Sequence, residues 1–185
     1  MKNAAQTPTT TSRPLLWNTH HDQPQSRRVE VIALLNRELA DVLDLKLQAK
    51  QAHWNVKGAQ FAALHELFDE VAAGADEIAD ELAERAVMLG GVARGTIQSV
   101  AAASRLATYP AEALASDEHI RALSGALARV AHSLRNAIAV ATTQEDAGTA
   151  DVLTQASRSV DKLLWQVEAH VALEPRSTEP VKSLT

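Results

Sequence analysis

Two long stretches without proline constrain the fold of this chain more than any other feature of its sequence. The six prolines leave residues 25–109 and 111–174 free of this helix-breaking residue, and both stretches are rich in Ala, Leu, Glu and Arg. Neither stretch shows the alternating pattern typical of strands or an Asn-Gly hairpin signal. The sequence therefore predicts an all-α fold.

Apolar residues at helical spacing divide the two stretches into four long helices, which we expect over residues 28–56, 60–89, 117–144 and 149–172. Ser116 and the two acids that follow it mark the start of the third helix. The left-handed backbone of a C-terminal cap is expected after each of the first three helices, at Gly58, Gly90 and Gly148.

The connection over residues 91–116 is too long for a tight turn, and its middle, TIQSVAAAS, indicates a short extra helix. Four long helices with one long crossover are the ferritin-like arrangement of a bundle. We therefore expect a ferritin-like four-helix bundle over residues 28–173. A mobile N-terminal tail is expected over 1–27 and a short C-terminal tail over 174–185.

Charge and composition exclude several classes of function. Subtracting +3 for residues 1–28 and +1 for residues 175–185 from the net charge of -5 leaves -9 for the body, unlike a uniformly basic nucleic-acid coat. The absence of Cys means that any metal must be held by His, Asp or Glu. No apolar run is long enough to span a bilayer and no secretory leader is evident, so we expect a cytoplasmic protein.

The second helix carries an unusual density of acids. Eight of the twenty residues from His65 to Glu84 are acidic, and one side, beside the apolar stripe, gathers His65, Asp69, Asp76, Asp80 and Glu84. His53, one residue before Trp54, lies on the apolar side of the first helix. Together these residues would form a nitrogen and oxygen site suited to Fe(II), Zn or Mn. The alternatives are a solvated charged face and a histidine that is part of the core.

Spacing along the second helix bears on whether one subunit can build such a site. His65 and Glu84 are 19 residues apart, about 28 Å along a helix. The pairs His65/Glu84 and Asp69/Asp80 share a midpoint between Gly74 and Ala75, where small residues would let two helices cross closely. An antiparallel second copy would therefore place one half of the site opposite the other. The chain has no Glu-x-x-His motif for a di-iron site within one subunit.

Four segments are similar to the Dps family of mini-ferritins: KQAHWNVKG at 50–58, FAALHELFDE at 61–70, DELAERAVMLGG at 80–91 and TADVLTQASRSVDKLLW at 149–165. The resemblance implies a hollow dodecamer with a ferroxidase site for two irons between two-fold-related subunits. It assigns His53, His65 and Asp69 to one subunit and Asp80 and Glu84 to the other. Hydrogen peroxide is the implied oxidant, ahead of oxygen, and the Fe(III) product is stored as mineral. Trp54 matches a tryptophan beside the iron site, with a role in packing or radical quenching.

The same resemblance raises two further assignments. Asp146 and Asp151 look like acids that line an iron-entry pore on the three-fold axis, and their alternative role is as capping charges in the loop and first helical turn. Non-specific DNA binding, with nucleoid association, would use basic residues near the N-terminus, at Lys2, Arg13, Arg27 and Arg28. The rival functions are therefore a ferroxidase and storage shell, a nucleoid-compacting protein, and a helical oligomer without chemistry.

Overall fold

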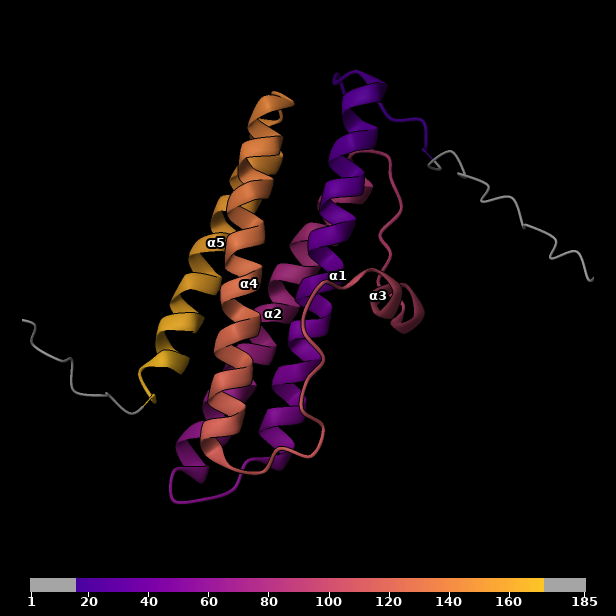
Figure 1. Ribbon diagram of the computed structural model, residues 1–185. Coiled ribbons are helices and arrows are strands. Elements are labelled where there is room, and N and C mark those ends of the chain that lie inside the picture. Colours follow the sequence, from indigo (N-terminus) through magenta and orange to yellow (C-terminus); the bar gives the residue numbers. More distant parts are fainter. Residues whose placement is uncertain (1–15, 172–185) are drawn as a thin grey trace, which may run out of the picture.

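The computed structural model describes residues 16–171, over which the chain forms five helices (Figure 1). They are α1 (Gln25–Asn55), α2 (Phe61–Met88), α3 (Ile97–Ala103), α4 (Ser116–Thr143) and α5 (Ala147–Glu168). The predicted all-α fold, with a short helix between the second and third long ones, is confirmed. No described helix is long and apolar enough to cross a membrane.

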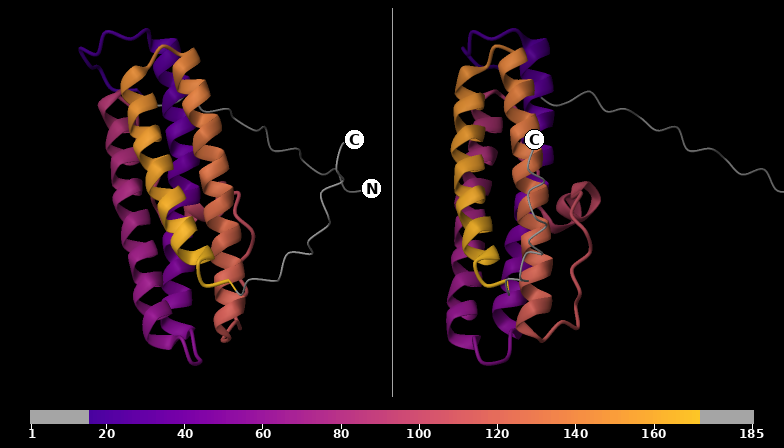
Figure 2. Two further views of the ribbon diagram at one scale, coloured as in Figure 1. Left: turned by 90° about the vertical axis from the view of Figure 1, so that its left-hand side faces the viewer. Right: turned by 60° about the vertical axis from the view of Figure 1, so that its left-hand side comes forward.

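The four long helices form a bundle in which α2 and α4 occupy opposite corners. α1 packs against both of them, and α5 does the same from the other side, while α3 lies outside the bundle against α1 (Figures 1 and 2). α2 carries eight acids and one arginine, whereas α4 has acids only in its first turn, at Asp117 and Glu118. The bundle therefore exposes an acidic corner and, diagonally across from it, a corner whose charges are mainly basic.

The core is a continuous cluster of apolar side chains from all four long helices. Its large members are fully buried and include Leu35, Leu45, Phe68, Leu82, Leu127 and Leu153. Burial of each such side chain stabilises the fold by about 1.5–3 kcal/mol before the entropy of ordering the chain is subtracted. This packing sets the register between α1 and α2, and with it the placement of the polar residues at their ends.

One of the three predicted glycine caps is confirmed. Gly90 directly follows Leu89, the C-cap of α2, and has a φ of 85°. Gly58 also has a positive φ, 122°, but it lies two residues beyond Val56, the C-cap of α1. After α4, however, Glu145 takes the positive φ, at 56°, and Gly148 lies inside the first turn of α5. A Cβ on Gly148 would come within 3.0 Å of the Arg85 guanidinium, so this glycine makes room for a side chain rather than for a turn.

Helix boundaries differ from the predictions by a few residues. α1 begins at Gln25, and α5 ends at Glu168. The residue that caps α4 is Ala115, so Ser116 is the first helical residue, and its hydroxyl donates to the Lys57 carbonyl at 3.0 Å. The Glu118 carboxylate caps this helix by accepting the Ala115 backbone N–H at 3.1 Å.

The segment before α1 packs against the end of α2. The Trp17 backbone N–H donates to the Gly90 carbonyl at 2.7 Å, and Arg28 Nη1 donates to the Leu89 carbonyl at 2.9 Å. A Cβ on Gly90 would lie 2.9 Å from the Trp17 carbonyl oxygen, so this contact requires glycine. Of the predicted N-terminal tail, residues 1–15 lie outside the described residues, as does the predicted tail over 174–185.

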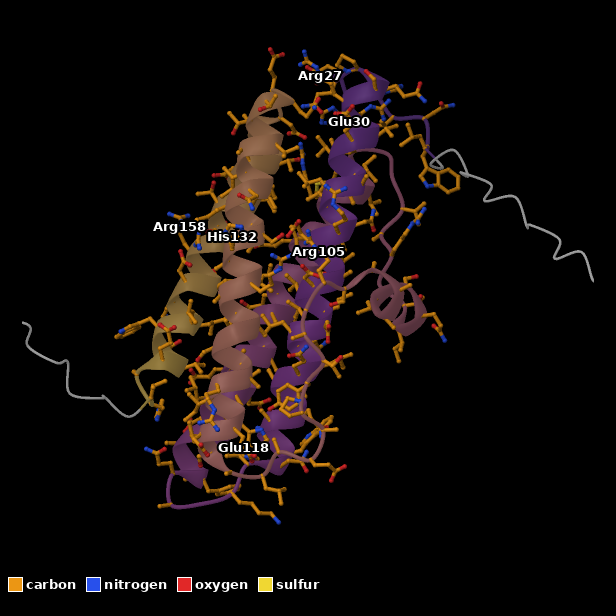
Figure 3. All side chains as sticks on the ribbon, in the orientation of Figure 1. Arg27, Glu30, Arg105, Glu118, His132 and Arg158 are labelled. Atoms are coloured by element: carbon orange, nitrogen blue, oxygen red, sulfur yellow. The ribbon has the colours of Figure 1, made fainter. Side chains whose placement is uncertain are left out.

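One arginine holds the long crossover to the bundle. Arg105, just after α3, lies between α1 and α4 (Figure 3). Its Nη2 donates to Asp41 at 2.7 Å, Glu38 at 3.0 Å and Ser133 at 2.9 Å. Burial opposes the charge of this guanidinium, but the two carboxylates outweigh that cost and raise the Arg105 pKa. The crossover is thereby fixed over the groove between α1 and α4.

Candidate metal centre

The short turn between α1 and α2 brings two histidines together at one end of the bundle. His53 lies in the last turn of α1 and His65 in the second turn of α2, and their ring centroids are 3.7 Å apart with planes at 20°. Phe61, one turn before His65, stacks on the other side of that ring at 5.0 Å. The spacing of Phe61 and His65 was a signal for this contact that the sequence analysis did not use.

Reciprocal hydrogen bonds orient both rings. His53 Nδ1 lies 2.6 Å from the His65 carbonyl oxygen, and His65 Nδ1 lies 2.8 Å from the His53 carbonyl oxygen. A carbonyl can only accept, so each Nδ1 carries a proton, and Nε2 is the ring nitrogen left to bind a metal. Neither Nε2 bonds to another described residue, so both remain open to a metal.

Asp69 follows His65 by one turn of α2 and completes this half of the site. Lys50 on α1 donates to Asp69 Oδ1 at 2.5 Å. This hydrogen bond holds the pKa of Asp69 below its usual value, so the carboxylate is ionised at neutral pH. Its second oxygen, Oδ2, has no partner among the described residues. The structure thus brings His53 and His65 into contact, and Asp69 follows one helical turn beyond His65.

Asp80 and Glu84 lie farther along α2 and are exposed. Asp80 is 11 residues beyond Asp69, about 16 Å along the helix, which is too far for one ion to be shared. Within residues 16–171, no group of three or more His, Asp or Glu side chains is placed to hold a metal ion. A single subunit therefore presents two separate half-sites at different levels of α2, one of which also includes His53 of α1.

The small residues at the middle of α2 do not form an open crossing surface. Ala75 is fully buried, and a Cβ on Gly74 would lie 3.0 Å from Leu163 of α5. Gly74 and Ala75 therefore pack inside their own subunit, and a two-fold axis passing near them stays a prediction. At the same level, the exposed residues of α2 are Ala73, Asp76 and Glu77.

Trp54 and Lys50 form the surface beside the histidines. Trp54 is 66% exposed, and Lys50 Nζ lies 6.0 Å from its ring centroid. A large aromatic side chain left this open on a helix is typical of a surface that another molecule covers. The role of Trp54 beside an iron site stays a prediction.

Asp146 caps a helix, which is one of the two roles that the sequence allowed for it. It is the N-cap of α5, where it accepts the Thr149 backbone N–H at 2.9 Å and hydroxyl at 2.6 Å. Its carboxylate also pairs with Arg85 at 2.7 Å and is 2% exposed. Asp151 is exposed in the next turn of the same helix and has no ion pair with a described residue. A pore role for these two acids stays a prediction.

The arginines proposed for DNA contact already bind within the subunit. Arg27 pairs with Glu145 beyond the end of α4, and Arg28 donates to the Gln23 carbonyl at 3.2 Å and to the Leu89 carbonyl. Each would have to leave these partners to reach a phosphate. Lys2 and Arg13 lie outside the described residues.

Comparison with known proteins gives a consistent result. Residues 32–177 match the model of the ferritin-like domain family. The "DNA protection during starvation protein" of Agrobacterium fabrum is 44% identical over 153 residues, which cover 83% of this chain and 94% of that protein. The "DNA protection during starvation protein 2" of Deinococcus radiodurans is 29% identical over 93% of this chain and 71% of its own length.

Solved structures agree with these relatives. DpsC from Streptomyces coelicolor has a TM-score of 0.84 at 28% identity, with 91% of this chain and 98% of that chain covered. Dps from Microbacterium arborescens in the high iron form has a TM-score of 0.75 at 31% identity, covering 80% of this chain and 95% of that one.

Proposed function

The chain belongs to the Dps family within the ferritin-like superfamily, and from this premise we propose that it is a ferroxidase and iron-storage shell. Its substrate is Fe(II), hydrogen peroxide is the preferred oxidant, and the Fe(III) product is retained as mineral within a dodecamer. The protein would thereby protect DNA from oxidative damage, in keeping with the names of its relatives.

The paired histidines are the observation that carries this proposal. Each Nδ1 is bound to the carbonyl of the other residue, so both rings are oriented with Nε2 open before any metal arrives. Orientation of a ligating imidazole through its other nitrogen is a general feature of metal sites. Two imidazoles with nearby carboxylate oxygens suit Fe(II) and keep coordination positions open for an oxidant.

Completion of the site requires a second subunit. The histidine half supplies His53, His65 and Asp69, and the acidic half supplies Asp80 and Glu84 from a two-fold-related copy. Both halves include residues of α2, so an antiparallel partner places its acidic half beside the histidine half of the first subunit. The acidic half of the first subunit lies in turn beside the histidine half of the partner. The two-fold interface would then hold two identical sites, each binding two irons.

The chemistry uses one peroxide molecule for two iron ions. Each Fe(II) gives up one electron, the O–O bond of hydrogen peroxide breaks, and its two oxygens accept the two electrons and leave as hydroxide. Taking both electrons at one site avoids the single-electron reduction that releases hydroxyl radical. The carboxylates favour the product charge state, since hard anionic oxygen ligands stabilise Fe(III).

Lys50 would tune the first binding step. Its ammonium occupies Asp69 Oδ1 and leaves Oδ2 for iron, so Asp69 would act as a ligand through one oxygen. The positive charge also raises the energy of a cation bound close by. The acidic corner formed by α2 acts in the opposite direction over a longer range, by attracting Fe(II) toward this helix.

Stopped-flow absorbance tests the proposal. We would mix the iron-free particle with Fe(II) and either peroxide or oxygen under matched conditions, and determine the particle mass on the same sample. Rapid peroxide-dependent oxidation by a dodecamer is expected. A dodecamer that oxidises iron no faster than the protein-free control would refute the ferroxidase assignment.

Non-specific DNA binding is the alternative, and a truncation separates it from iron oxidation. Deletion of residues 1–15 removes Lys2 and Arg13 but keeps the contact of Trp17 with Gly90. If the tails bind DNA, this deletion abolishes retardation of a DNA duplex and leaves the rate of iron oxidation unchanged.

A further inference from the structure

Three arginines line one hollow on the face of the bundle covered by the crossover. This hollow, of about 460 Å³, lies between the segment after α3 and the first half of α4. Its cationic lining residues are Arg105, Arg121 and Arg129, and no acidic residue lines it. It is separate from the histidine pair, which involves only α1 and α2.

The sequence of α4 builds the floor of this hollow. Arg121, Gly125 and Arg129 recur at intervals of four residues, so the two arginines stand on one side of the helix about 12 Å apart along its axis. Between the two arginines, the residues that line the hollow are small: Ala122, Gly125 and Ala126. A Cβ on Gly125 would meet nothing within 4 Å, so the space above the floor is open.

The three guanidinium groups differ in how many of their N–H groups already have a hydrogen-bond partner. Arg105 uses Nε and Nη2 on Asp41 and Glu38, while its Nη1 donates to no described residue. Arg121 pairs with Asp117 at 2.8 Å, but both side chains are about two-thirds exposed and such a pair is easily exchanged. Arg129 has no ion pair with a described residue.

The opposite wall of the hollow is fixed in place. Gln48 of α1 donates to the Ala107 carbonyl at 3.2 Å, and the Tyr109 hydroxyl lies 2.6 Å from His119 Nδ1. Gln48, Ala107 and Tyr109 all line the hollow. The arginines therefore surround a cavity whose walls are already ordered, which lowers the entropic cost of binding.

From this arrangement we infer that the hollow is a binding site for a phosphate group. Guanidinium groups bind phosphate oxygens through paired, charge-assisted hydrogen bonds, and a tetrahedral dianion offers acceptors to three of them at once. A carboxylate is planar and carries a single charge, so it matches three guanidinium groups less well than a tetrahedral dianion does. The Arg105 side chain is only about one-third exposed, so free phosphate, which is small enough to reach it, is the expected source, rather than the backbone of a nucleic acid.

Calorimetric titration of the iron-free, full-length particle with inorganic phosphate tests this inference without iron chemistry. The double variant Arg121→Gln/Arg129→Gln should weaken phosphate binding about tenfold or more, because it removes two charge-assisted contacts. Gly125→Glu places a carboxylate over the open floor and should abolish binding without crowding the core. Arg158→Gln is the matched control, since Arg158 is an exposed arginine of α5 outside the hollow (Figure 3).

The inference is overturned if the wild type shows no saturable binding at millimolar phosphate, or if both variants bind as the wild type does. Retardation of a short DNA duplex distinguishes the source. We expect the double variant and the wild type to retard DNA equally. Loss of retardation in the double variant alone would overturn free phosphate as the source and assign the site to backbone phosphates.

Discussion

Two polar clusters at opposite ends of α2 differ in how far their polar atoms already have hydrogen-bond partners. Near its C-terminal end, Arg85, Asp146 and Thr149 bond to one another, and the Asp146 carboxylate is 2% exposed. Near its N-terminal end, His53 and His65 bond to each other's backbone and leave two ring nitrogens open. The first cluster is saturated and buried, and the second is ordered but unsaturated at the surface. Saturation therefore separates a structural cluster from one that is ready to bind a ligand.

The largest effect should come from the saturated cluster. Asp146→Ala leaves Arg85 without its buried partner and removes the α5 cap, so we expect a loss of about 3–5 kcal/mol in the free energy of unfolding. Denaturant unfolding at matched subunit concentration measures it. Asp151→Ala, an exposed acid on the same helix, is the control and should change stability by less than about 0.5 kcal/mol. Equal effects of the two substitutions would show that burial does not distinguish them.

The cluster of Arg85, Asp146 and Thr149 predicts that the stability of the protein depends on pH. Burial opposes ionisation of Asp146, but hydrogen bonds from Thr149 and the Arg85 charge outweigh it and hold its pKa below the usual value. A lowered pKa in the folded state stabilises the protein above the unfolded pKa of about 3.9, and this contribution is lost as the pH falls through the folded value. The stability difference between wild type and Asp146→Asn should be constant near neutrality and shrink below about pH 4. A stability difference that grows as the pH falls would mean that folding does not lower the pKa of Asp146.

The unsaturated cluster should show its effect in rate rather than in stability. His65→Ala or Asp80→Ala should slow iron oxidation about 100-fold, equivalent to about 2.7 kcal/mol in activation free energy, with the particle still assembled. Stopped-flow measurement with peroxide gives the rates. Glu77→Ala changes an exposed acid of α2 outside the ligand set and should leave the rate unchanged. Wild-type rates in both ligand variants would remove these residues from the site.

A smaller change is expected from Lys50, which pairs with Asp69 beside the histidines. Lys50→Met frees Asp69 Oδ1 and removes a positive charge from the histidine half, so Fe(II) should bind about fivefold more tightly. Anaerobic titration of the iron-free particle measures this affinity. Weaker binding in the variant would mean that Lys50 serves mainly to orient Asp69.

The smallest effect is expected from an exposed arginine–aspartate ion pair, which is the same kind of pair as Arg85 and Asp146 in the saturated cluster. Arg135 on α4 pairs with Asp161 on α5 at 3.0 Å, and both side chains are about half exposed. Arg135→Gln should change the free energy of unfolding by no more than about 0.5 kcal/mol, because solvent screens such pairs. A loss comparable to that of Asp146→Ala would show that this pair is buried in the assembled particle.

Much of the fold followed from periodicity and proline placement, because helices are specified locally. The all-α architecture and the extra helix could be predicted in this way. The left-handed residue after α4 could not, since the glycine signal at Gly148 reflects the space taken by Arg85, which comes from a helix distant in sequence. For the same reason the sequence did not show that Gly74 packs against Leu163 of α5, because small residues indicate close packing without showing what packs there.

The residues of the candidate site come from the sequence, and their division between two subunits stays a prediction. Spacing and resemblance gave His53, His65 and Asp69 as one half and Asp80 and Glu84 as the other. Neither could show the reciprocal carbonyl bonds, because these depend on the angle between α1 and α2 at the turn. The hollow lined by Arg121 and Arg129 was also missed, although RALSGALAR places two arginines around a glycine at helical spacing.

The central claim is that each iron site is shared between two subunits, and complementation tests it most directly. One variant, His53→Ala/His65→Ala, lacks the histidine half, and another, Asp80→Ala/Glu84→Ala, lacks the acidic half. Each should be inactive alone. In particles co-assembled from equal amounts, half of the two-fold pairs are mixed and each mixed pair holds one intact site of two, so about a quarter of the wild-type rate should return. Mixed particles as inactive as their parents would contradict a shared site.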